Sequence, residues 1–443
     1  MGRKYFGTDG VRGRVGEHPM TVEFALRLAS AAARVLAPQG GAALVGKDTR
    51  ISGYMFEAAL EAGFIAAGVD VNLIGPLPTP GIAYLTQKFG CRFGVVISAS
   101  HNPYEDNGIK FFDAEGSKLP DALEEQIERY LDEPALTHES NHLGRASRID
   151  KSRVVYQEFC QQTLPAGLDL AEIKIVVDCA NGAAYKVAPR VLADLGAEII
   201  PIGCSPNGRN INLRCGSTAP ELVQATVTGV RADVGIALDG DGDRVVMVDH
   251  LGRSVDGDQL LYIIAADRKR RGELAGPVVG TVMSNLGLEQ SLAAEGVPFL
   301  RAKVGDRYVM AMLKEHGGVL GGETSGHLLC LDRTTTGDGL VSALQVLAVM
   351  KRTGRSLAEL AAGMPKFPQV MINVKVKERI DPANSPAIQA AVRKAEAALG
   401  TTGRVVLRAS GTEALIRVMV EAREDAVATR HAHELAEVVR GAV

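Results

Sequence analysis

Short apolar runs that predict β-strands alternate along this chain with longer stretches in which apolar residues recur at helical spacing. Gly, Pro, Asn or Asp marks most of the junctions between them. In the first third, strands are predicted at 42–46, 70–75 and 93–98, separated by helices at 54–68 and 79–89. These elements make two consecutive βαβ units, which is the signature of an α/β fold.

The same cycle of strand and helix restarts near residues 173 and 276, so the pattern predicts three α/β units of similar size. A polar, charged stretch over 131–153 suits a boundary between the first two units. After Gly363 the pattern changes to strand-like runs around a long helical run, followed by a final helix. We therefore predict three mixed α/β domains, at 1–150, 151–252 and 253–364, and a smaller C-terminal α+β domain at 365–443.

Composition agrees with this multidomain architecture. The 443 residues suggest about three domains of roughly 150 residues, with two or four also compatible. Apolar residues make up 46% of the chain and charged residues 23%, as in globular proteins with sizeable cores. Lys and Arg total 49 against 52 Asp and Glu, so the net charge of −3 offers no basic excess for nucleic acid or an anionic membrane. An anionic ligand must then be held by a local site.

The cysteines and the apolar segments bear on the compartment. The six cysteines form no CxxC pair and the closest two are eleven residues apart, which argues against a zinc site or a disulfide framework. The N-terminal residues hold no apolar segment of signal-peptide length, and the most apolar stretch, 340–350, is too short to span a bilayer. We expect a cytoplasmic protein with reduced thiols.

The strongest local signal for chemistry is a group of three carboxylates, Asp239, Asp241 and Asp243, between two apolar runs. At this spacing they can converge on one hard cation, and ligands that are all oxygen favour Mg²⁺ or Ca²⁺. An EF-hand is excluded because Arg244 stands where that loop needs Gly and His250 where it needs Glu. The alternative is an acidic solvated turn, but uncompensated carboxylates this crowded repel one another. A Mg²⁺ site with open positions for a phosphate oxygen is the better hypothesis.

A second signal is the segment SASHNP at 98–103, which follows a predicted strand. Ligands usually bind at the carboxyl ends of strands in an open α/β sheet, so Ser100 or Ser98 could be a nucleophile. The spacing does not match the GxSxG elbow of hydrolases. In isolation, a Ser/Asn/Pro turn that satisfies its own backbone is the favoured explanation of the segment. Lys110, a few residues further on, supplies a cation that could shuttle a proton or bind phosphate.

Two later segments could bind a sugar phosphate. Arg408, Ser410, Gly411 and Thr412, with Arg417 on the following run, could cradle a phosphate without a P-loop, although a polar hairpin turn fits the same residues. The segment GETSGH at 322–327 offers a carboxylate, two hydroxyls and an imidazole for hydrogen bonds to a polyol, although an N-cap or loop contact of Glu323 is the slightly favoured alternative from the segment alone.

A third glycine-containing segment proves less informative. Residues 41–47 fit the Walker A frame G-x-x-x-x-G-K, but Asp48 stands where Ser or Thr must ligate Mg²⁺ and the intervening residues are typical of a strand. We therefore reject a nucleotide P-loop. Lys47 and Arg50 remain candidates for ligand contacts or ion pairs.

Five motifs taken together give a more specific answer. The segments FGTDGVRG at 6–13, SASHNP, DGDGDR, GETSGH and RASGTE occur in that order over nearly the whole chain, which resembles the α-D-phosphohexomutase superfamily. Two further segments, DCANGAAYKVAP at 178–189 and TTTGDG at 334–339, look most like its bacterial phosphoglucosamine mutase branch.

The resemblance implies four domains around a central cleft, with Ser100 carrying a phosphoryl group as phosphoserine. Asp239, Asp241 and Asp243 would hold Mg²⁺ together with an oxygen on Ser100. The catalytic residues implied are Ser100, Arg12, His101, Lys110 and His327. The substrate-binding residues implied are Arg244, Glu323, Ser325, Arg408, Ser410, Gly411, Thr412 and Arg417. Ser98 stands where many relatives carry Thr, and relatives vary at Thr324, which makes that position a candidate for tuning the choice of sugar.

The function implied is interconversion of glucosamine 6-phosphate and glucosamine 1-phosphate through a sugar 1,6-bisphosphate, for cell-wall amino-sugar precursors. The implied cofactors are Mg²⁺ and the bisphosphate as activator, and the implied partners are small sugar phosphates, without nucleic acid or membrane, while a homodimer stays open. A cleft that closes would need a hinge before the last domain. The alternatives are phosphomannomutase/phosphoglucomutase activity, a Mg²⁺-dependent phosphatase that releases free phosphate, and a binding protein without turnover.

Overall fold

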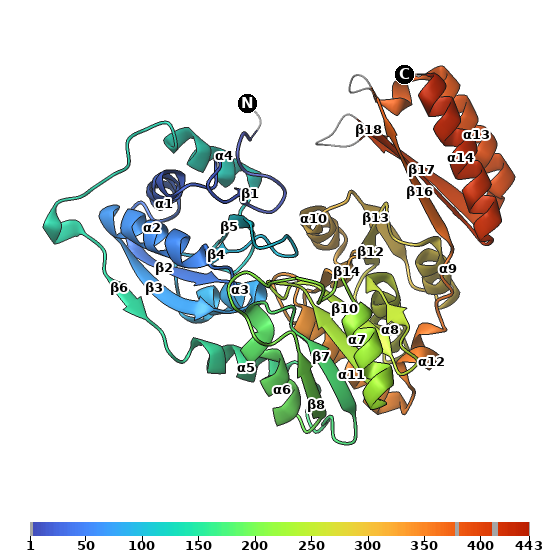
Figure 1. Ribbon diagram of the computed structural model, residues 1–443, viewed down its shortest axis with the longest axis horizontal. Helices are drawn as coiled ribbons and strands as arrows, with labels where there is room; N and C mark the ends of the chain where they lie inside the picture. Colours follow the sequence, from blue (N-terminus) through green and yellow to red (C-terminus); the bar gives the residue numbers. More distant parts are fainter. Residues whose placement is uncertain (1–2, 377–380, 410–414, 443) are drawn as a thin grey trace.

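Among the residues that the computed structural model describes, namely 3–376, 381–409 and 415–442, the strands form four separate sheets (Figure 1). Each sheet with its helices is one structural unit, and the four units follow one another along the chain. Three are mixed α/β units and the last is a smaller antiparallel sheet with two helices, which confirms the predicted fold class.

The first unit contains a six-stranded sheet in the order β1-β5-β4-β2-β3-β6. Its strands are β1 (Val11–Arg14), β2 (Gly41–Lys47), β3 (Val69–Pro76), β4 (Phe93–Ile97), β5 (Asp106–Phe112) and β6 (Ala146–Arg148), and its helices are α1 (Val22–Leu36), α2 (Gly53–Ala66), α3 (Thr79–Lys88) and α4 (Asp121–Tyr130). β2 pairs in parallel with both β3 and β4, so the two predicted βαβ units are confirmed. β4 is buried along its whole length, as expected for a strand covered on both faces.

The second unit contains a five-stranded sheet in the order β11-β10-β9-β7-β8. Its strands are β7 (Lys174–Asp178), β8 (Glu198–Ile202), β9 (Val234–Leu238), β10 (Val245–Asp249) and β11 (Ser254–Val255), and its helices are α5 (Ser152–Gln162), α6 (Ala188–Asp194) and α7 (Glu221–Val230). β9 and β10 are antiparallel neighbours, so the three aspartates lie on the turn that joins them. β11 pairs with β10, which extends this sheet beyond residue 252.

The third unit contains a four-stranded sheet in the order β13-β12-β14-β15. Its strands are β12 (Val278–Thr281), β13 (Phe299–Ala302), β14 (Leu320–Gly322) and β15 (Leu328–Cys330), and its helices are α8 (Gly257–Arg270), α9 (Leu286–Ala294), α10 (Asp306–His316), α11 (Gly339–Thr353) and α12 (Leu357–Ala361). Helix α11 explains the most apolar stretch of the sequence, because residues 339–350 are all buried in the protein interior. The Asp338 side chain caps this helix by accepting a hydrogen bond from the Val341 amide.

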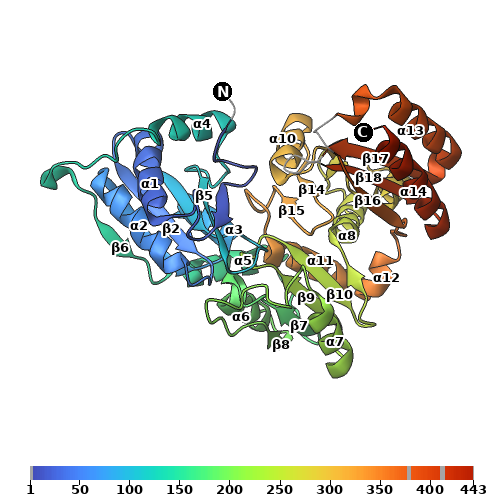
Figure 2. The same ribbon diagram turned by 45° about the horizontal axis from the view of Figure 1, so that its top comes forward.

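The fourth unit contains a three-stranded antiparallel sheet in the order β16-β18-β17. Its elements are β16 (Gln369–Lys375), α13 (Pro386–Leu399), β17 (Gly403–Ala409), β18 (Leu415–Ala422) and α14 (Asp425–Gly441). Short 3₁₀ turns complete the described structure, at Ser140–His142, Ala183–Lys186, Pro382–Asn384 and Gly400–Thr402. The first and fourth units lie at opposite ends of the molecule, with the second and third between them (Figure 2).

The hydrophobic cores divide the molecule differently from the sheets. One cluster of buried side chains continues from Ile82 of the first unit, through Val177 of the second, to Leu344 on α11. The side chains of the fourth unit form a cluster of their own, which includes Val418 and Leu435. The first three units are therefore packed into one body. The fourth unit is attached to this body through hydrogen bonds with the third unit.

Within the described ranges, every helix is too short or too polar to cross a bilayer.

Candidate active site

Loops from all four units line one cleft of about 810 Å³. The lining residues are Tyr5, Gly7, Thr8, Asp9, Gly10, Arg12, His101, Lys118, Asp243, Arg244, Val282, Lys303, Val304, Gly305, Asp306, Tyr308, Glu323, His327 and Arg408. All five motifs identified in the sequence contribute to this lining. The fifth, RASGTE, contributes Arg408, and its residues Ser410, Gly411 and Thr412 lie outside the described residues.

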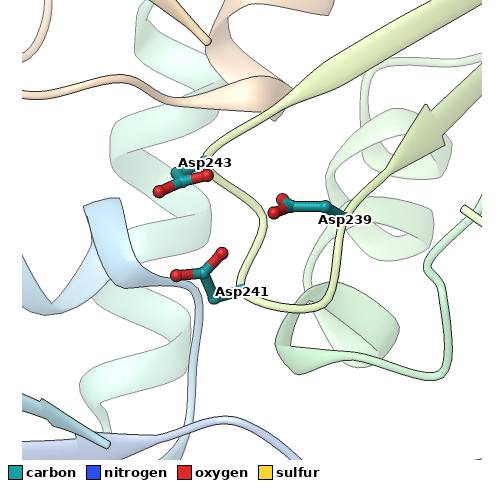
Figure 3. A group of neighbouring side chains, drawn as sticks. All are labelled: Asp239, Asp241 and Asp243. Atoms are coloured by element: carbon teal, nitrogen blue, oxygen red, sulfur yellow. The ribbon is translucent and has the colours of Figure 1, made fainter. Parts of the chain in front are cut away.

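The aspartate loop between β9 and β10 places three carboxylates face to face. Asp239, Asp241 and Asp243 are all buried, and one oxygen of each lies within 4.8 Å of the others. Figure 3 shows the three carboxylates gathered around one arm of this loop, with Asp239 extending toward the other two. One oxygen of Asp241 and one of Asp243 have no hydrogen-bond partner, which is costly for buried carboxylates unless a cation compensates them. The donor set is oxygen only, so these residues fit Mg²⁺.

Lys110 on β5 partly neutralises this cluster. Its ammonium nitrogen lies 2.8 Å from Asp241 and 2.8 Å from Asp9, and 3.9 Å from Asp243. Burial alone would lower the pKa of Lys110, but the carboxylates of Asp241 and Asp9 raise it above its usual value. Burial and the charges of Asp243 and Asp241 raise the pKa of Asp239 well above its usual range, whereas Lys110 outweighs burial and lowers the pKa of Asp241. Lys110 is therefore a fixed positive charge beneath the cluster.

Ser100 faces the aspartate loop from the first unit. It is buried, and its hydroxyl donates to Asp239 over 2.5 Å. The His101 Nδ1 atom lies 3.4 Å from the same hydroxyl oxygen. The backbone of Ser100 has a φ of 52°, which is uncommon for a residue with a side chain and is often a mark of a constrained functional site.

A buried arginine holds the Ser100 loop in this conformation. The Arg50 side chain has no exposed surface, pairs with Asp48, and donates to the carbonyls of Ser100 at 3.2 Å, Asn102 at 2.5 Å and Asp106 at 2.8 Å. The amide of Asn212, from the second unit, donates to the same carbonyls of Ser100 at 2.9 Å and Asn102 at 3.1 Å. Arg50 thus has an ion-pair role, and it fixes the loop together with Asn212.

The two serines of the loop have different surroundings. Ser98 is fully buried; its hydroxyl donates to Asp48 over 2.5 Å and accepts from the Ser100 amide over 2.9 Å. Those bonds leave Ser98 as a structural support, whereas the Ser100 hydroxyl faces the aspartate loop. Lys47 pairs with Glu57 inside the first unit, and residues 41–47 form strand β2 as expected.

A network of ion pairs continues from the loop across the cleft. Asp9 binds Arg12 and, at 2.5 Å, Lys118, which in turn lies 2.6 Å from Asp306. His327 lies 3.2 Å from Asp306 and 3.6 Å from Asp243. The network therefore connects the first unit to the third through the cleft.

The two histidines of the site differ in charge. Burial opposes protonation of His327, but Asp243 and Asp306 raise its pKa to about 10, so it is an imidazolium at neutral pH. Burial, together with Arg244 and Arg12, lowers the pKa of His101 to about 4, so it is a neutral imidazole. Gly337 of the TTTGDG segment packs against the His327 ring, where a Cβ atom would come within 2.3 Å of the ring.

The GETSGH loop contributes unequally to the cleft. Glu323 lines it and accepts a hydrogen bond from the Gly305 amide over 2.9 Å. Ser325 is exposed and lies outside the lining. The Thr324 hydroxyl turns into the third unit, where it donates to Asp258 over 2.8 Å, so the structure gives no direct contact through which Thr324 would choose the sugar.

Arg408 and Arg417 face each other on β17 and β18, as directly opposed residues of the antiparallel pair. Arg408 lines the cleft, and burial and the charge of Arg417 lower its pKa. Two guanidinium groups this close repel each other, so an anion between them would be stabilising.

Sequence reasoning did not assign a role to Asp9, Lys118, Asp306 or Asn212. Asp9 lies within the FGTDGVRG motif, and Asp306 follows β13 at the carboxyl end of a parallel strand, the same position that singled out Ser100. Lys118 and Asn212 lie on irregular segments without a spacing signal. Their roles depend on contacts between units that are far apart in the sequence.

Comparison with known proteins gives matches over almost all of the chain. Family models of the phosphoglucomutase/phosphomannomutase family match as follows: domain I at residues 3–137, domain II at 156–252, domain III at 256–367 and the C-terminal domain at 371–438. Among curated relatives, the phosphoglucosamine mutase of Alkalilimnicola ehrlichii is 59% identical and covers 100% of this chain and 98% of the relative. That of Thioalkalivibrio sulfidiphilus is 58% identical, covering 99% and 98%.

Two solved structures have a similar fold over nearly the whole length of this chain. A phosphoglucomutase/phosphomannomutase family protein from Burkholderia thailandensis has a TM-score of 0.81 at 25% identity, covering 99% of this chain and 98% of that one. The N-acetylphosphoglucosamine mutase of Aspergillus fumigatus, solved with GlcNAc-6P and magnesium, has a TM-score of 0.69 at 19% identity, covering 99% and 96%. At 19% identity, the similarity to the Aspergillus fumigatus structure shows a shared fold and nothing more.

Replacing Asp241 with Asn tests the metal site. The variant loses one of three carboxylate charges, so we expect its affinity for Mg²⁺, measured by titration calorimetry, to fall at least about tenfold. Turnover that depends on the metal should fall at least about 100-fold. The half-exposed Asp194, which pairs with Arg190 on the surface, gives a matched control as Asp194→Asn. Unchanged Mg²⁺ affinity in Asp241→Asn would refute the three-aspartate site.

Replacing Arg50 with Lys tests the support of the Ser100 loop. A lysine cannot donate to Asp48 and three carbonyls at once, so the backbone around Ser100 should become more mobile. We expect hydrogen exchange of residues 99–103, followed by mass spectrometry, to rise about tenfold or more, with the remaining sheet protected as before. Arg190→Lys, at an exposed pair, is the control. Equal exchange in Arg50→Lys and wild type would mean that Asn212 alone suffices.

Proposed function

The chain belongs to the phosphoglucomutase/phosphomannomutase family, and we propose that it is a phosphoglucosamine mutase, which interconverts glucosamine 6-phosphate and glucosamine 1-phosphate. The observation that carries this proposal is the buried Ser100 hydroxyl, which lies 2.5 Å from Asp239. The neighbours of these two residues, His101 and Asp243, line a cleft to which all four units contribute. The choice of the amino sugar rests on full-length relatives of that name at 56–59% identity.

In the proposed reaction, Ser100 carries a phosphoryl group on its hydroxyl oxygen. O1 of glucosamine 6-phosphate attacks the phosphorus in line, the bond from phosphorus to the Ser100 oxygen breaks, and the O1 proton leaves to a base. The product is glucosamine 1,6-bisphosphate. The bisphosphate then reorients in the cleft so that its 6-phosphate faces Ser100. Its O6 phosphoryl group is transferred to the Ser100 oxygen, and glucosamine 1-phosphate is released.

The charged side chains around Ser100 can stabilise this transfer electrostatically. Mg²⁺ held by Asp239, Asp241 and Asp243 would supply positive charge beside the transferring phosphoryl group. Lys110, Arg12 and the His327 imidazolium surround the same point with fixed positive charge. The neutral His101 is the neighbouring group that can accept a proton.

The rest of the cleft would hold the substrate. We assign Arg244 and Glu323, which line the cleft, to the sugar hydroxyls, together with Ser325, which is exposed beside the lining on the same loop as Glu323. We assign Arg408 and Arg417, with Ser410, Gly411 and Thr412, to the phosphate that is not reacting. Both half reactions use the same Ser100, so this distal site must accept the 6-phosphate in one half and the 1-phosphate in the other. The bisphosphate thereby acts as intermediate and as activator, and the product would feed cell-wall amino-sugar precursors in the cytoplasm.

The decisive assay measures conversion of glucosamine 6-phosphate to the 1-phosphate, with Mg²⁺ and a trace of sugar 1,6-bisphosphate. We expect kcat/KM to exceed that for glucose and mannose phosphates by at least about tenfold, which corresponds to one well-placed contact with the amino group. Ser100→Ala should abolish the conversion. Equal or faster turnover of glucose phosphates would instead assign the chain to phosphoglucomutase/phosphomannomutase activity, and steady release of inorganic phosphate would indicate a phosphatase.

Replacing Arg417 with Ala tests the distal phosphate site. A contact to the phosphate that is not reacting is similar in the ground state and the transition state, so KM should rise more than kcat falls. We expect KM for glucosamine 6-phosphate to rise about tenfold, by analogy with the loss of one charge-assisted hydrogen bond. A fall confined to kcat would place Arg417 at the reacting phosphoryl group.

A further inference from the structure

The segment 282–285, which we call the interdomain loop, connects β12 to α9 and contacts the chain where it enters the fourth unit. Asn285 is almost fully buried there. Its side-chain amide donates to the Phe367 carbonyl over 2.9 Å and accepts from the Phe367 amide over 3.0 Å. Asn285 therefore binds both backbone groups of one residue in the linker between the third and fourth units, as a neighbouring strand would.

The same asparagine is tied to the GETSGH loop through a buried carboxylate. The Asn285 backbone amide donates to Asp258 Oδ2 over 2.9 Å, and the Thr324 hydroxyl donates to the same oxygen over 2.8 Å. Asp258 has no exposed surface. Thr324 lies between Glu323 and Ser325, so an unbroken chain of hydrogen bonds leads from the GETSGH loop through the interior to Phe367.

A second set of contacts fixes the interdomain loop to the sheet of the fourth unit. Arg404 on β17 donates to the carbonyls of Val282 at 3.0 Å and Ser284 at 2.6 Å, and it pairs with Glu421, which has no exposed surface. Arg404 and Arg408 are four residues apart on one strand, so they lie on the same face about 13 Å from each other. The strand that carries Arg408 into the cleft is therefore fixed by its other end to this loop.

These contacts bear on the distance between the two surfaces that would contact the substrate, namely the GETSGH loop and the strand that carries Arg408. A sugar phosphate has a fixed distance between its hydroxyls and its phosphate, so Glu323 on one wall of the cleft and Arg408 on the other must be held at a matching separation. We propose that Asp258, Asn285 and Thr324 are positioning residues that set this separation by linking the GETSGH loop to the entry of the fourth unit. This inference rests on the proposed sugar-phosphate ligand, and it gives Thr324 a function without contact to the sugar.

Two conservative variants interrupt the chain at different points. Thr324→Val keeps the size of the side chain but loses the donor to Asp258. Asn285→Asp keeps the shape and one acceptor oxygen but loses the donor to the Phe367 carbonyl. Thr324→Ser restores the hydroxyl and is the rescue variant. Thr163→Val removes a different buried threonine hydroxyl, which donates to the Cys160 carbonyl, and controls for a general loss of stability.

The first readout is hydrogen exchange of the backbone at 366–368 in the protein without ligand, which does not depend on the identity of the sugar. We expect it to rise about tenfold in Thr324→Val and in Asn285→Asp, and to stay at the wild-type rate in Thr324→Ser and Thr163→Val. Wild-type exchange in both interrupted variants would overturn the proposal, whatever the protein's substrate proves to be.

The second readout compares a ligand that spans the cleft with one that does not. The dissociation constant of glucosamine 6-phosphate, or of glucose 6-phosphate if that is the preferred sugar, should rise about tenfold in Thr324→Val, which is within the range of coupling between connected sites. The dissociation constant of inorganic phosphate, which needs only the distal site, should change less than about twofold. Equal weakening of both ligands would mean general damage and would refute a role in spacing.

The double variant gives the third readout. If Thr324 and Asn285 act in one chain, breaking both links costs no more than breaking one, so the double variant should bind glucosamine 6-phosphate as Asn285→Asp does, within about twofold. Multiplication of the two single effects would show that the residues act independently and would overturn the proposal. A wild-type protein without mutase turnover would count against the proposed function alone, because the exchange measurement stands apart from turnover.

Discussion

Concentrated negative charge is the constraint around which this structure is organised. Three buried carboxylates on one turn would repel each other strongly without compensation. Their neighbours supply that compensation as positive charges or as a hydrogen-bond donor. Lys110 comes from the first unit and His327 from the third, and the Ser100 hydroxyl donates to Asp239. Because these groups belong to different sheets, satisfying the carboxylates requires that the units be assembled around them.

The shared hydrophobic core makes that assembly rigid. The first three units share one continuous cluster of buried side chains, so Ser100, the aspartate loop and the GETSGH loop sit on a single body. Arg50 and Asn212 then hold Ser100 in a backbone conformation that a residue with a side chain adopts at some cost. The fourth unit has its own core and meets the third unit through hydrogen bonds. The molecule therefore combines a site fixed on one body, around Ser100 and the aspartate loop, with a fourth unit that has a core of its own.

The sequence was informative where the signal is local. Alternating strands and helices predicted the βαβ units of residues 42–98, and the spacing of Asp239, Asp241 and Asp243 predicted their convergence, because neighbours on one turn must lie close together. The choice between Ser98 and Ser100 could not be made from the residues alone, since it depends on Asp48 and Asp239, which lie 50 and 139 positions away from their respective partners.

The remaining features depend on which backbone groups meet across units, and residue type does not encode that. Arg50 was a candidate for an ion pair, but its three carbonyl partners are visible only in the folded chain. Asp258 and Asn285 lie in ordinary helix-start positions and gave no signal. Thr324 was a candidate for tuning the choice of sugar because relatives vary at this position, yet its hydroxyl donates to the buried Asp258.

The position of Lys110 has a consequence for how readily a metal ion exchanges. Its ammonium group already binds an oxygen of Asp241 and so neutralises part of the negative charge of the three carboxylates. A bound cation is therefore stabilised less than it would be by three carboxylates without this neighbour. Such a site favours an ion that also binds a phosphoryl oxygen over an ion that binds the protein alone. If Ser100 carries the proposed phosphoryl group, occupancy of the aspartate site by Mg²⁺ would follow the phosphorylation state of Ser100, and the protein without that group would exchange the ion with the surroundings instead of retaining it.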